Sequence, residues 1–228
     1  MNFFKIKNFL LVFLIIFSYL ISVVKTYAVD ITADRTISSS SDGDQYNIKT
    51  NNDIDVIVTN NSTLERNQKI FNVSAASLTG SSITIHLGSS VIAETNSIFS
   101  NGAELTITNT GTIEATNSKA INVSNSDGVS ITNNNNGVIK SNNNTILGDA
   151  GTGADNVTID NSGEIYTTAT GTESSAIVFA NNDTGNTITN NSGGEIYSSG
   201  SESTIVLGVS STLTNSGSIK NNKSVTNK

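Results

Sequence analysis

Hydrophobic and polar residues alternate in short runs over most of the chain after residue 28, and clusters of Asn, Gly, Ser and Asp separate the runs. This alternation is typical of β-strands, because successive side chains of a strand point to opposite faces. The separating residues tolerate the backbone conformations of tight turns. No segment after Ala28 has an apolar stripe with the 3.6-residue period of a helix, so the pattern predicts an all-β fold.

One unit of this pattern recurs along the chain. Its clearest copy, at residues 107–113, reads Ile-Thr-Asn-Thr-Gly-Thr-Ile, and degraded copies start at Ile131, Ile159, Ile188 and Leu213. Successive copies start 24, 28, 29 and 25 residues apart, which suits loops of variable length between fixed strands. Further apolar clusters lie between the copies, at residues 120–123, 145–147, 176–179 and 204–207. Each repeat therefore contains about three short strands.

Three short strands per repeat, with no helix between them, describe one coil of a right-handed parallel β-helix, which is a β-solenoid. Coils pair at a spacing of about 4.8 Å, so about six to seven coils over residues 56–220 form a rod roughly 30 Å long. The sequence contains no proline, in agreement with central strands that must donate every N–H group to a neighbour. We expect residues 29–55 to form an N-terminal cap or lead-in and residues 221–228 to form a polar tail.

Residues 1–28 have the layout of a secretory signal peptide. Lys5 and Lys7 form a basic start, residues 9–24 are almost entirely apolar, and small residues precede a cleavage site after Ala28. The alternative is an uncleaved membrane anchor, but this apolar run is shorter than the roughly 20 residues that a membrane-spanning helix needs. We therefore predict cleavage and export.

The composition excludes several kinds of chemistry. The chain has no Cys and a single His, His86, so thiol nucleophiles, Cys-ligated metals and histidine clusters are ruled out. The net charge is −7, and it becomes −10 when Lys5, Lys7 and Lys25 leave with the signal peptide, which argues against a nucleic-acid partner. Residues 150–157 approximate one nonapeptide of a calcium-binding β-roll, but a turn between coils explains them equally well. We predict no metal site and no cofactor.

A carbohydrate-active β-helix enzyme would need paired carboxylates with a neighbouring base or metal. Asp53 and Asp55 share a strand face, and Glu164 and Glu195 share a column, but neither pair has an Arg or His nearby in the sequence. His86 alternates away from its apolar neighbours and is expected on the outside of a strand. We interpret these five residues as exposed surface groups, predict no catalytic residue, and expect a protein that is not an enzyme.

Stacked coils place equivalent residues in columns. The residues that follow the repeated turn form an outward column, in which Glu114 is expected beside Lys140 and Tyr166 beside Tyr197. The Asn of each turn points inward and is expected to form a structural ladder of side-chain amides. The ladder comprises Asn109, Asn161 and Asn215, with Asn133 or Asn135 and Asn190 or Asn191 at the coils between.

Hydroxyl side chains flank the inward Ile of the same strands and define an outward Thr face. Its members are Thr106, Thr108, Thr132, Thr158, Thr187, Thr189, Thr212 and Thr214. A Thr-x-Thr array of this kind resembles the face of ice-binding β-solenoids. Threonine is also a common surface residue of strands, and Ser82, Ser130 and Asp160 interrupt the array.

The turns at residues 109–113 and 161–165 resemble those in the passenger region of bacterial type V autotransporters, which are large surface proteins with β-helical, adhesin-like stalks. The resemblance covers roughly Ile83 to Ile219 and the signal peptide. It implies export, an outward-facing rod that is secreted or held at the outer membrane of a Gram-negative bacterium, and contacts with surface molecules of host or neighbouring cells. It also implies a C-terminal translocator barrel, whose amphipathic strands are missing from the sequence up to Lys228. We therefore expect a truncated or split passenger, or a short secreted relative.

Together these features predict an exported, non-enzymatic surface protein that acts as a structural stalk or adhesin. We expect it to contact a membrane only during export or through the missing C-terminal barrel. The unpaired edge of the last coil also predicts end-to-end self-association. Three alternatives stay open: the carbohydrate-active enzyme, the ice-binding solenoid and a largely disordered mature chain.

Overall fold

The computed structural model describes residues 28–49, 53–59, 61–74, 78–102, 104–148 and 153–221. These residues form 24 β-strands and no helix, so none of them belongs to a helix suited to crossing a membrane. The predicted signal peptide at residues 1–28 and polar tail at residues 221–228 lie outside the described residues, apart from Ala28 and Asn221.

The strands form three sheets of eight strands each. The first sheet contains β1 (Ala28–Ile31), β4 (Gln45–Ile48), β7 (Phe71–Val73), β10 (Ile98–Ser100), β13 (Ile121–Asn122), β16 (Ile146–Leu147), β19 (Ile177–Val178) and β22 (Ile205–Val206). The second contains β2 (Arg35–Ile37), β5 (Asp55–Val58), β8 (Ser81–Ile85), β11 (Leu105–Asn109), β14 (Ser130–Asn133), β17 (Thr158–Asn161), β20 (Thr187–Asn190) and β23 (Thr212–Asn215). The third contains β3 (Ser41–Asp42), β6 (Thr63–Arg66), β9 (Ser90–Ala93), β12 (Thr112–Ala115), β15 (Val138–Ser141), β18 (Glu164–Thr167), β21 (Glu195–Ser198) and β24 (Ser218–Asn221).

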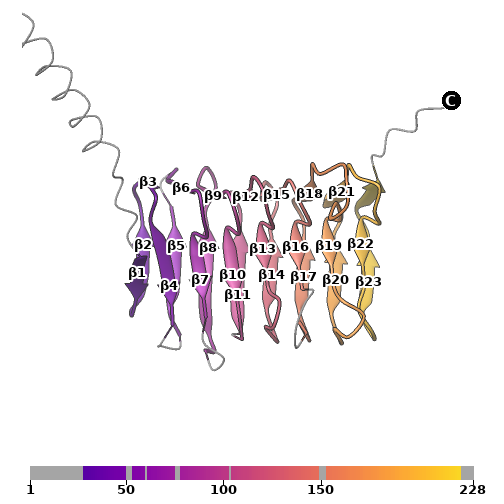
Figure 1. The fold of residues 1–228 in the computed structure, drawn as a ribbon, viewed down its shortest axis with the longest axis horizontal. Helices are drawn as coiled ribbons and strands as arrows, with labels where there is room; N and C mark the ends of the chain where they lie inside the picture. The colour runs from indigo at the N-terminus through magenta and orange to yellow at the C-terminus, as the bar shows by residue number, and fades with distance from the viewer. Residues whose placement is uncertain are drawn as a thin grey trace, which may run out of the picture.

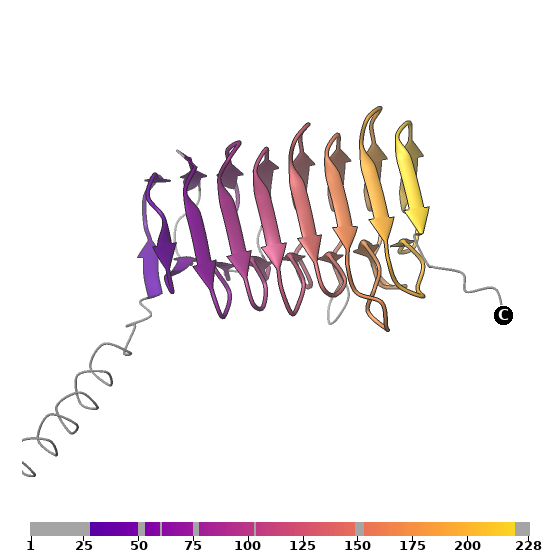
Figure 2. The ribbon, with the colours of Figure 1, turned by 90° about the horizontal axis from the view of Figure 1, so that it is seen from above.

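Each strand pairs in parallel with the strand three places later in the chain, so every third strand returns to the same sheet one coil further along. Figures 1 and 2 show the result, a rod of stacked coils with its ends at opposite poles. The predicted all-β parallel β-solenoid is thereby confirmed, and the described residues are not the disordered chain that was the alternative.

The predicted coil number agrees with the strands between residues 56 and 220. In that range the first sheet contributes six strands and the other two sheets contribute seven each. Residues 29–55, for which we predicted a cap or lead-in, carry β1 to β4 and already form one further coil. Its strands pair in register with the next coil, for example Ile31 with Ile48 and Ile37 with Val58.

Small aliphatic side chains fill the interior in columns. One column of the second sheet runs Val56, Ile83, Ile107, Ile131, Ile159 and Ile188, and all six are fully buried. β-Branched side chains fit this arrangement, because they pack well against same-face neighbours on a pleated surface. Each buried Ile contributes about 1.5–3 kcal/mol relative to an exposed one, so a thin core without wide aromatic layers still holds the coils together.

The bend that leads into the second sheet requires residues that tolerate a left-handed backbone conformation. Three residues before the inward side chain of each strand, the backbone repeatedly enters the left-handed region. Positive φ angles occur there at Asp53 (55°), Gly80 (73°), Gly128 (69°), Asn156 (55°), Gly185 (69°) and Ser210 (55°). Gly, Asn and Asp adopt this conformation most readily, so the bend selects them at this position.

Candidate functional site

The second sheet presents a nearly uncharged outer surface. Thr106, Ser130, Thr158, Thr187 and Thr212 are register partners in one outward column. A second outward column runs Thr84, Thr108, Thr132, Asp160, Thr189 and Thr214. The structure therefore places all eight residues of the predicted Thr face on one sheet, in two parallel columns.

Several positions interrupt this hydroxyl face. Asp160 carries a charge in the second column, where its carboxylate accepts a hydrogen bond from the side-chain amide of Asn191. Towards the N-terminus the columns continue with Asp55 and Ile57. Asp55 accepts a hydrogen bond from Ser82 Oγ at 2.6 Å. Apart from Asp160, the hydroxyl array thus covers the coils from β8 to β23, and it ends at Asp55 and Ile57.

A ladder of asparagine side chains lies at the C-terminal ends of the strands of the second sheet, from β11 to β23. Each Nδ2 atom donates to the Oδ1 atom of the Asn on the next coil, at distances of 2.8–2.9 Å. The members in order are Asn109, Asn133, Asn161, Asn190 and Asn215. For the two coils where the sequence allowed two candidates each, the ladder members are Asn133 and Asn190. The first four members are fully buried, so each amide must find its partners inside the protein.

A column of glycines makes room for the Asn ladder. The first four Asn side chains also donate to a carbonyl oxygen of their own turn, for example from Asn161 Nδ2 to Gly163 O at 3.1 Å. A Cβ atom on Gly163 would lie 2.2 Å from the carbonyl oxygen of Gly137 on the preceding coil. The repeated Asn-x-Gly spacing therefore has one structural cause: glycine lets the turn backbone of neighbouring coils approach closely, so that its carbonyl oxygens reach the Asn amides.

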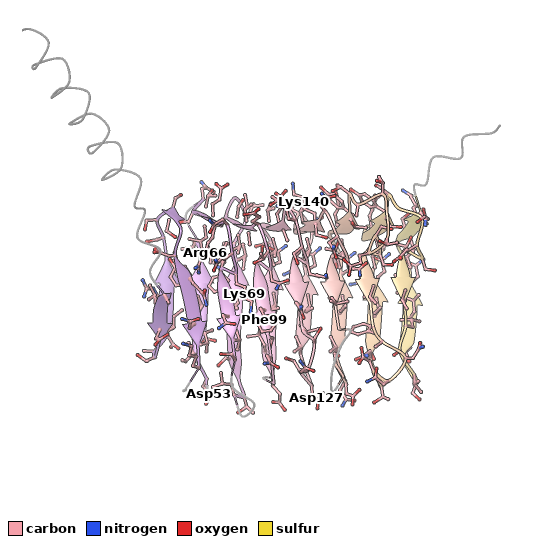
Figure 3. All side chains as sticks on the ribbon, in the orientation of Figure 1. Asp53, Arg66, Lys69, Phe99, Asp127 and Lys140 are labelled. Carbon is pink, nitrogen blue, oxygen red and sulfur yellow. The ribbon has the colours of Figure 1, made fainter. Side chains whose placement is uncertain are left out.

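Charged and aromatic residues gather on the third sheet. Lys140 Nζ lies 3.0 Å from Glu114 Oε2 on the preceding coil. The Lys140 side chain is 30% exposed and the Glu114 side chain is 25% exposed. Burial lowers the pKa of Lys140, but the hydrogen bond and charge of Glu114 raise this pKa by more, so it lies above its usual value. Figure 3 shows Lys140 at the outer surface of the rod.

Tyr166 and Tyr197 continue the same outward column. Their rings stack with centroids 4.5 Å apart and planes inclined by 7°. Burial, together with the neighbouring Tyr166 and the carboxylates of Glu164 and Glu195, raises the pKa of Tyr197 above its usual value. The sequence predicted both neighbouring pairs in this column, and the register confirms them.

The outward column of the first sheet changes from polar to apolar along the rod. It begins with Asp30, Asn47 and Asn72, and after Phe99 and Asn122 it continues with the partly buried side chains of Leu147, Val178 and Val206. The ammonium group of Lys69 lies 3.6 Å from the ring centroid of Phe99, and burial lowers the pKa of this lysine. Both residues are labelled on this face in Figure 3.

Two grooves follow the edge where the chain leaves the third sheet. One has a volume of about 440 Å³ and is lined by Glu65, Arg66, Asn67, Ile92, Ala93, Glu94, Thr116 and Asn117. The other has a volume of about 310 Å³ and is lined by Glu114, Ala115, Thr116, Lys140, Ser141, Asn142, Tyr166 and Thr168. They meet at Thr116. The sequence did not reveal these grooves, because they depend on which turn residues of successive coils come side by side.

The acidic pairs considered for catalysis lie in different surroundings. Asp53 is exposed and labelled at the turn edge in Figure 3, and its neighbour Asp55 binds Ser82. Glu164 and Glu195 are direct register partners, and Glu195 also lies 3.6 Å from Lys220 Nζ. Exposed His86 makes a contact of 3.4 Å between its Nδ1 atom and Thr59 Oγ1.

Metal-binding geometry is not found among the residues that the structure describes, where His, Cys, Asp and Glu form no group of three or more able to hold an ion. In the stretch that resembles a β-roll nonapeptide, Asp155 Oδ1 accepts a hydrogen bond of 2.6 Å from the backbone N–H of Thr184. Asn156 occupies the left-handed bend described above. These two residues therefore serve the turn between coils.

The stacked coils make this chain a parallel β-solenoid protein. The comparisons with known proteins add no closer relationship: no family model, no curated protein and no solved structure matches the chain.

Proposed function

We propose that this protein is an exported, non-enzymatic, passenger-like surface protein that acts as a structural stalk or adhesin. The observation that carries the proposal is the continuity of the rod, since three parallel sheets run through all eight coils and share one core. A solenoid of this kind presents long faces at fixed spacing, which suits display and multivalent contact. The turns that resemble autotransporter passengers and the signal-like N-terminus support export.

Localisation in the bacterium that makes the protein tests this proposal. Antibodies raised against the purified protein are expected to label intact cells, and external protease is expected to remove that labelling. The protein is also expected in the secreted fraction if it is released. Labelling that requires permeabilised cells, together with recovery from the cytoplasm, would contradict the proposal.

A second candidate function is ice binding through the hydroxyl face. The specific observation in its favour is that Thr106, Thr158, Thr187 and Thr212 share one column, with Ser130 between the first two. Thermal hysteresis and shaped ice crystals are expected from the purified protein under this candidate, and Thr158→Tyr with Thr187→Tyr should abolish both effects. Freezing without hysteresis or shaping in the unmodified protein removes this candidate.

A further inference from the structure

The two grooves lie end to end along the third sheet and share Thr116, and together we call them the axial groove. It extends over the five coils that contain β6, β9, β12, β15 and β18, because its two segments share Thr116. At the spacing of stacked coils, this corresponds to a length of about 19 Å. The groove therefore runs parallel to the rod axis and offers room for an extended polymer rather than for a compact molecule.

Strand geometry explains why the groove exists. One wall is the outward column of the third sheet, which includes Ile92, Glu114 and Lys140. The other wall is formed by side chains two residues further along each coil, and the intervening residues point inward. Those intervening residues include Ala93, Ala115 and Ser141, so the floor between the walls consists largely of backbone. The two walls are about 6.7 Å apart, as expected for residues i and i+2 of a strand.

The groove walls carry carboxylates, amides and hydroxyls that are already held in place. Asn117 Nδ2 donates to Glu94 Oε1 at 2.9 Å, and this bond joins two neighbouring coils. The ion pair between Glu114 and Lys140 joins the next two coils along the same groove. Thr168 donates its hydroxyl to the backbone oxygen of Ser141 at 3.2 Å. Side chains fixed in this way lose little conformational freedom when they bind a ligand.

The charges in the groove select the kind of polymer. Glu65, Glu94 and Glu114 line it with two cations, Arg66 and Lys140, which leaves one net negative charge. Lys140 is paired with Glu114, and the buried Arg66 donates to Gln45 Oε1 and to the Lys69 carbonyl oxygen. The resulting negative potential disfavours nucleic acids and anionic polysaccharides. A peptide cannot add to the sheet here, because β9, β12 and β15 each pair with a strand on both sides.

We propose that the axial groove binds an extended, non-anionic glycan chain. Glycan hydroxyls would donate to the Glu94 and Asn117 oxygens and accept from the side-chain amides, while Ile92 and Tyr166 supply apolar contact for the sugar ring faces. This inference rests on the proposed adhesin function and names the class of ligand for it. Multivalent contact along one chain suits a groove that repeats the same spacing from coil to coil.

Two exposed threonines provide a matched test. Thr116 stands where the two groove segments meet, and Thr158 stands on the hydroxyl face of the second sheet. Thr116→Trp fills the groove, whereas Thr158→Trp adds the same bulk elsewhere. The purified protein and both variants are applied to an array of neutral, amino-bearing and anionic oligosaccharides, and the strongest binder is then titrated by calorimetry. Circular dichroism verifies that both variants are folded.

We expect the protein to bind neutral or amino-bearing chains, with an affinity that increases with chain length. Thr116→Trp should lower this affinity at least about tenfold, and Thr158→Trp should change it by less than about twofold. Absence of binding, binding confined to anionic glycans, or equal losses in the two variants overturns the groove proposal. Surface location is measured separately. A displayed protein that binds no glycan contradicts the groove alone, whereas a cytoplasmic protein that binds glycan contradicts the proposed function.

Discussion

Asparagine and glycine share one corner of every coil from β11 onwards, and their roles differ. The Asn amide supplies a hydrogen bond to the next coil, while the Gly two to four residues later lets the turn backbone come close enough to be reached. In the first coils the same column holds Ile37, Val58 and Ile85. The column therefore accepts either a hydrocarbon or an amide, provided that the amides bond to one another.

Replacing a central member of the ladder should be costly for stability. Asn161→Leu keeps a similar volume but leaves Asn133 Nδ2 without its acceptor and Asn190 Oδ1 without its donor. We expect the free energy of unfolding in urea to fall by about 3 kcal/mol. The comparison variant is Asn109→Leu, at the start of the ladder beside Ile85, which removes the donor to Asn133 Oδ1 and the acceptor of the Gly111 N–H and should therefore cost a similar amount. Unchanged stability of Asn161→Leu would contradict the ladder's role.

The close approach at the glycine column gives a second prediction at this scale. In Gly163→Ala the new Cβ would meet the Gly137 oxygen at 2.2 Å, whereas nothing lies within 4 Å of a Cβ on Gly171. We expect Gly163→Ala to lower the free energy of unfolding by at least about 2 kcal/mol and Gly171→Ala to change it by less than about 0.5 kcal/mol. Chemical denaturation of both variants measures the difference. Equal effects at the two positions would show that the turn backbone is not tightly packed.

At the scale of strands, each sheet has its own outer chemistry. The second sheet is almost uncharged, the first ends in three partly buried apolar side chains, and the third carries two ion pairs and the tyrosine stack. Register neighbours on the third sheet include the like charges Glu164 and Glu195, which repel across adjacent strands. The nearby Lys220 offsets part of that repulsion. Tyr166 and Tyr197 stack two residues further along the same two strands, beside this pair of like charges.

The raised pKa of Tyr197 predicts a loss of stability in alkaline solution. Because the folded state binds this phenolic proton more tightly than the unfolded state does, stability is fully present below the ordinary tyrosine pKa of about 10 and declines as the pH rises above it. Urea midpoints of the unmodified protein and of Tyr197→Phe, measured at pH 8 and pH 11, test this. The variant should lose less stability between the two pH values. An equal or larger loss in Tyr197→Phe would contradict the assignment.

At the scale of the whole molecule, much of the rod follows from the sequence and some of it does not. The period-2 strands and the recurring Asn-x-Gly turn predict the coils, the ladder and the outward columns, because each repeats a local rule. The first coil contains no copy of that turn and its third strand, β3, spans only two residues, so we predicted a cap or lead-in there. The Glu94–Asn117 bond was also missed, since loop lengths that vary between repeats hide which turn residues meet.

The fold of the rod depends on the stacking of coils in register, and because the chain has no cysteine, introduced cysteine pairs can measure this stacking directly. Thr158 and Thr187 are register partners on adjacent coils, and Thr212 lies one coil beyond Thr187. Stacking places the first pair at about 4.8 Å between Cα atoms, within the range that a disulfide needs, and places Thr158 about 9.6 Å from Thr212, outside that range.

The measurement is oxidation of two double variants at low protein concentration, followed by alkylation and intact mass determination. Thr158→Cys with Thr187→Cys should close an intramolecular disulfide and resist alkylation, while Thr158→Cys with Thr212→Cys should stay reduced and take up two alkyl groups. Failure of the adjacent pair to close, or equal closure of the distant pair, would contradict the stacked coils.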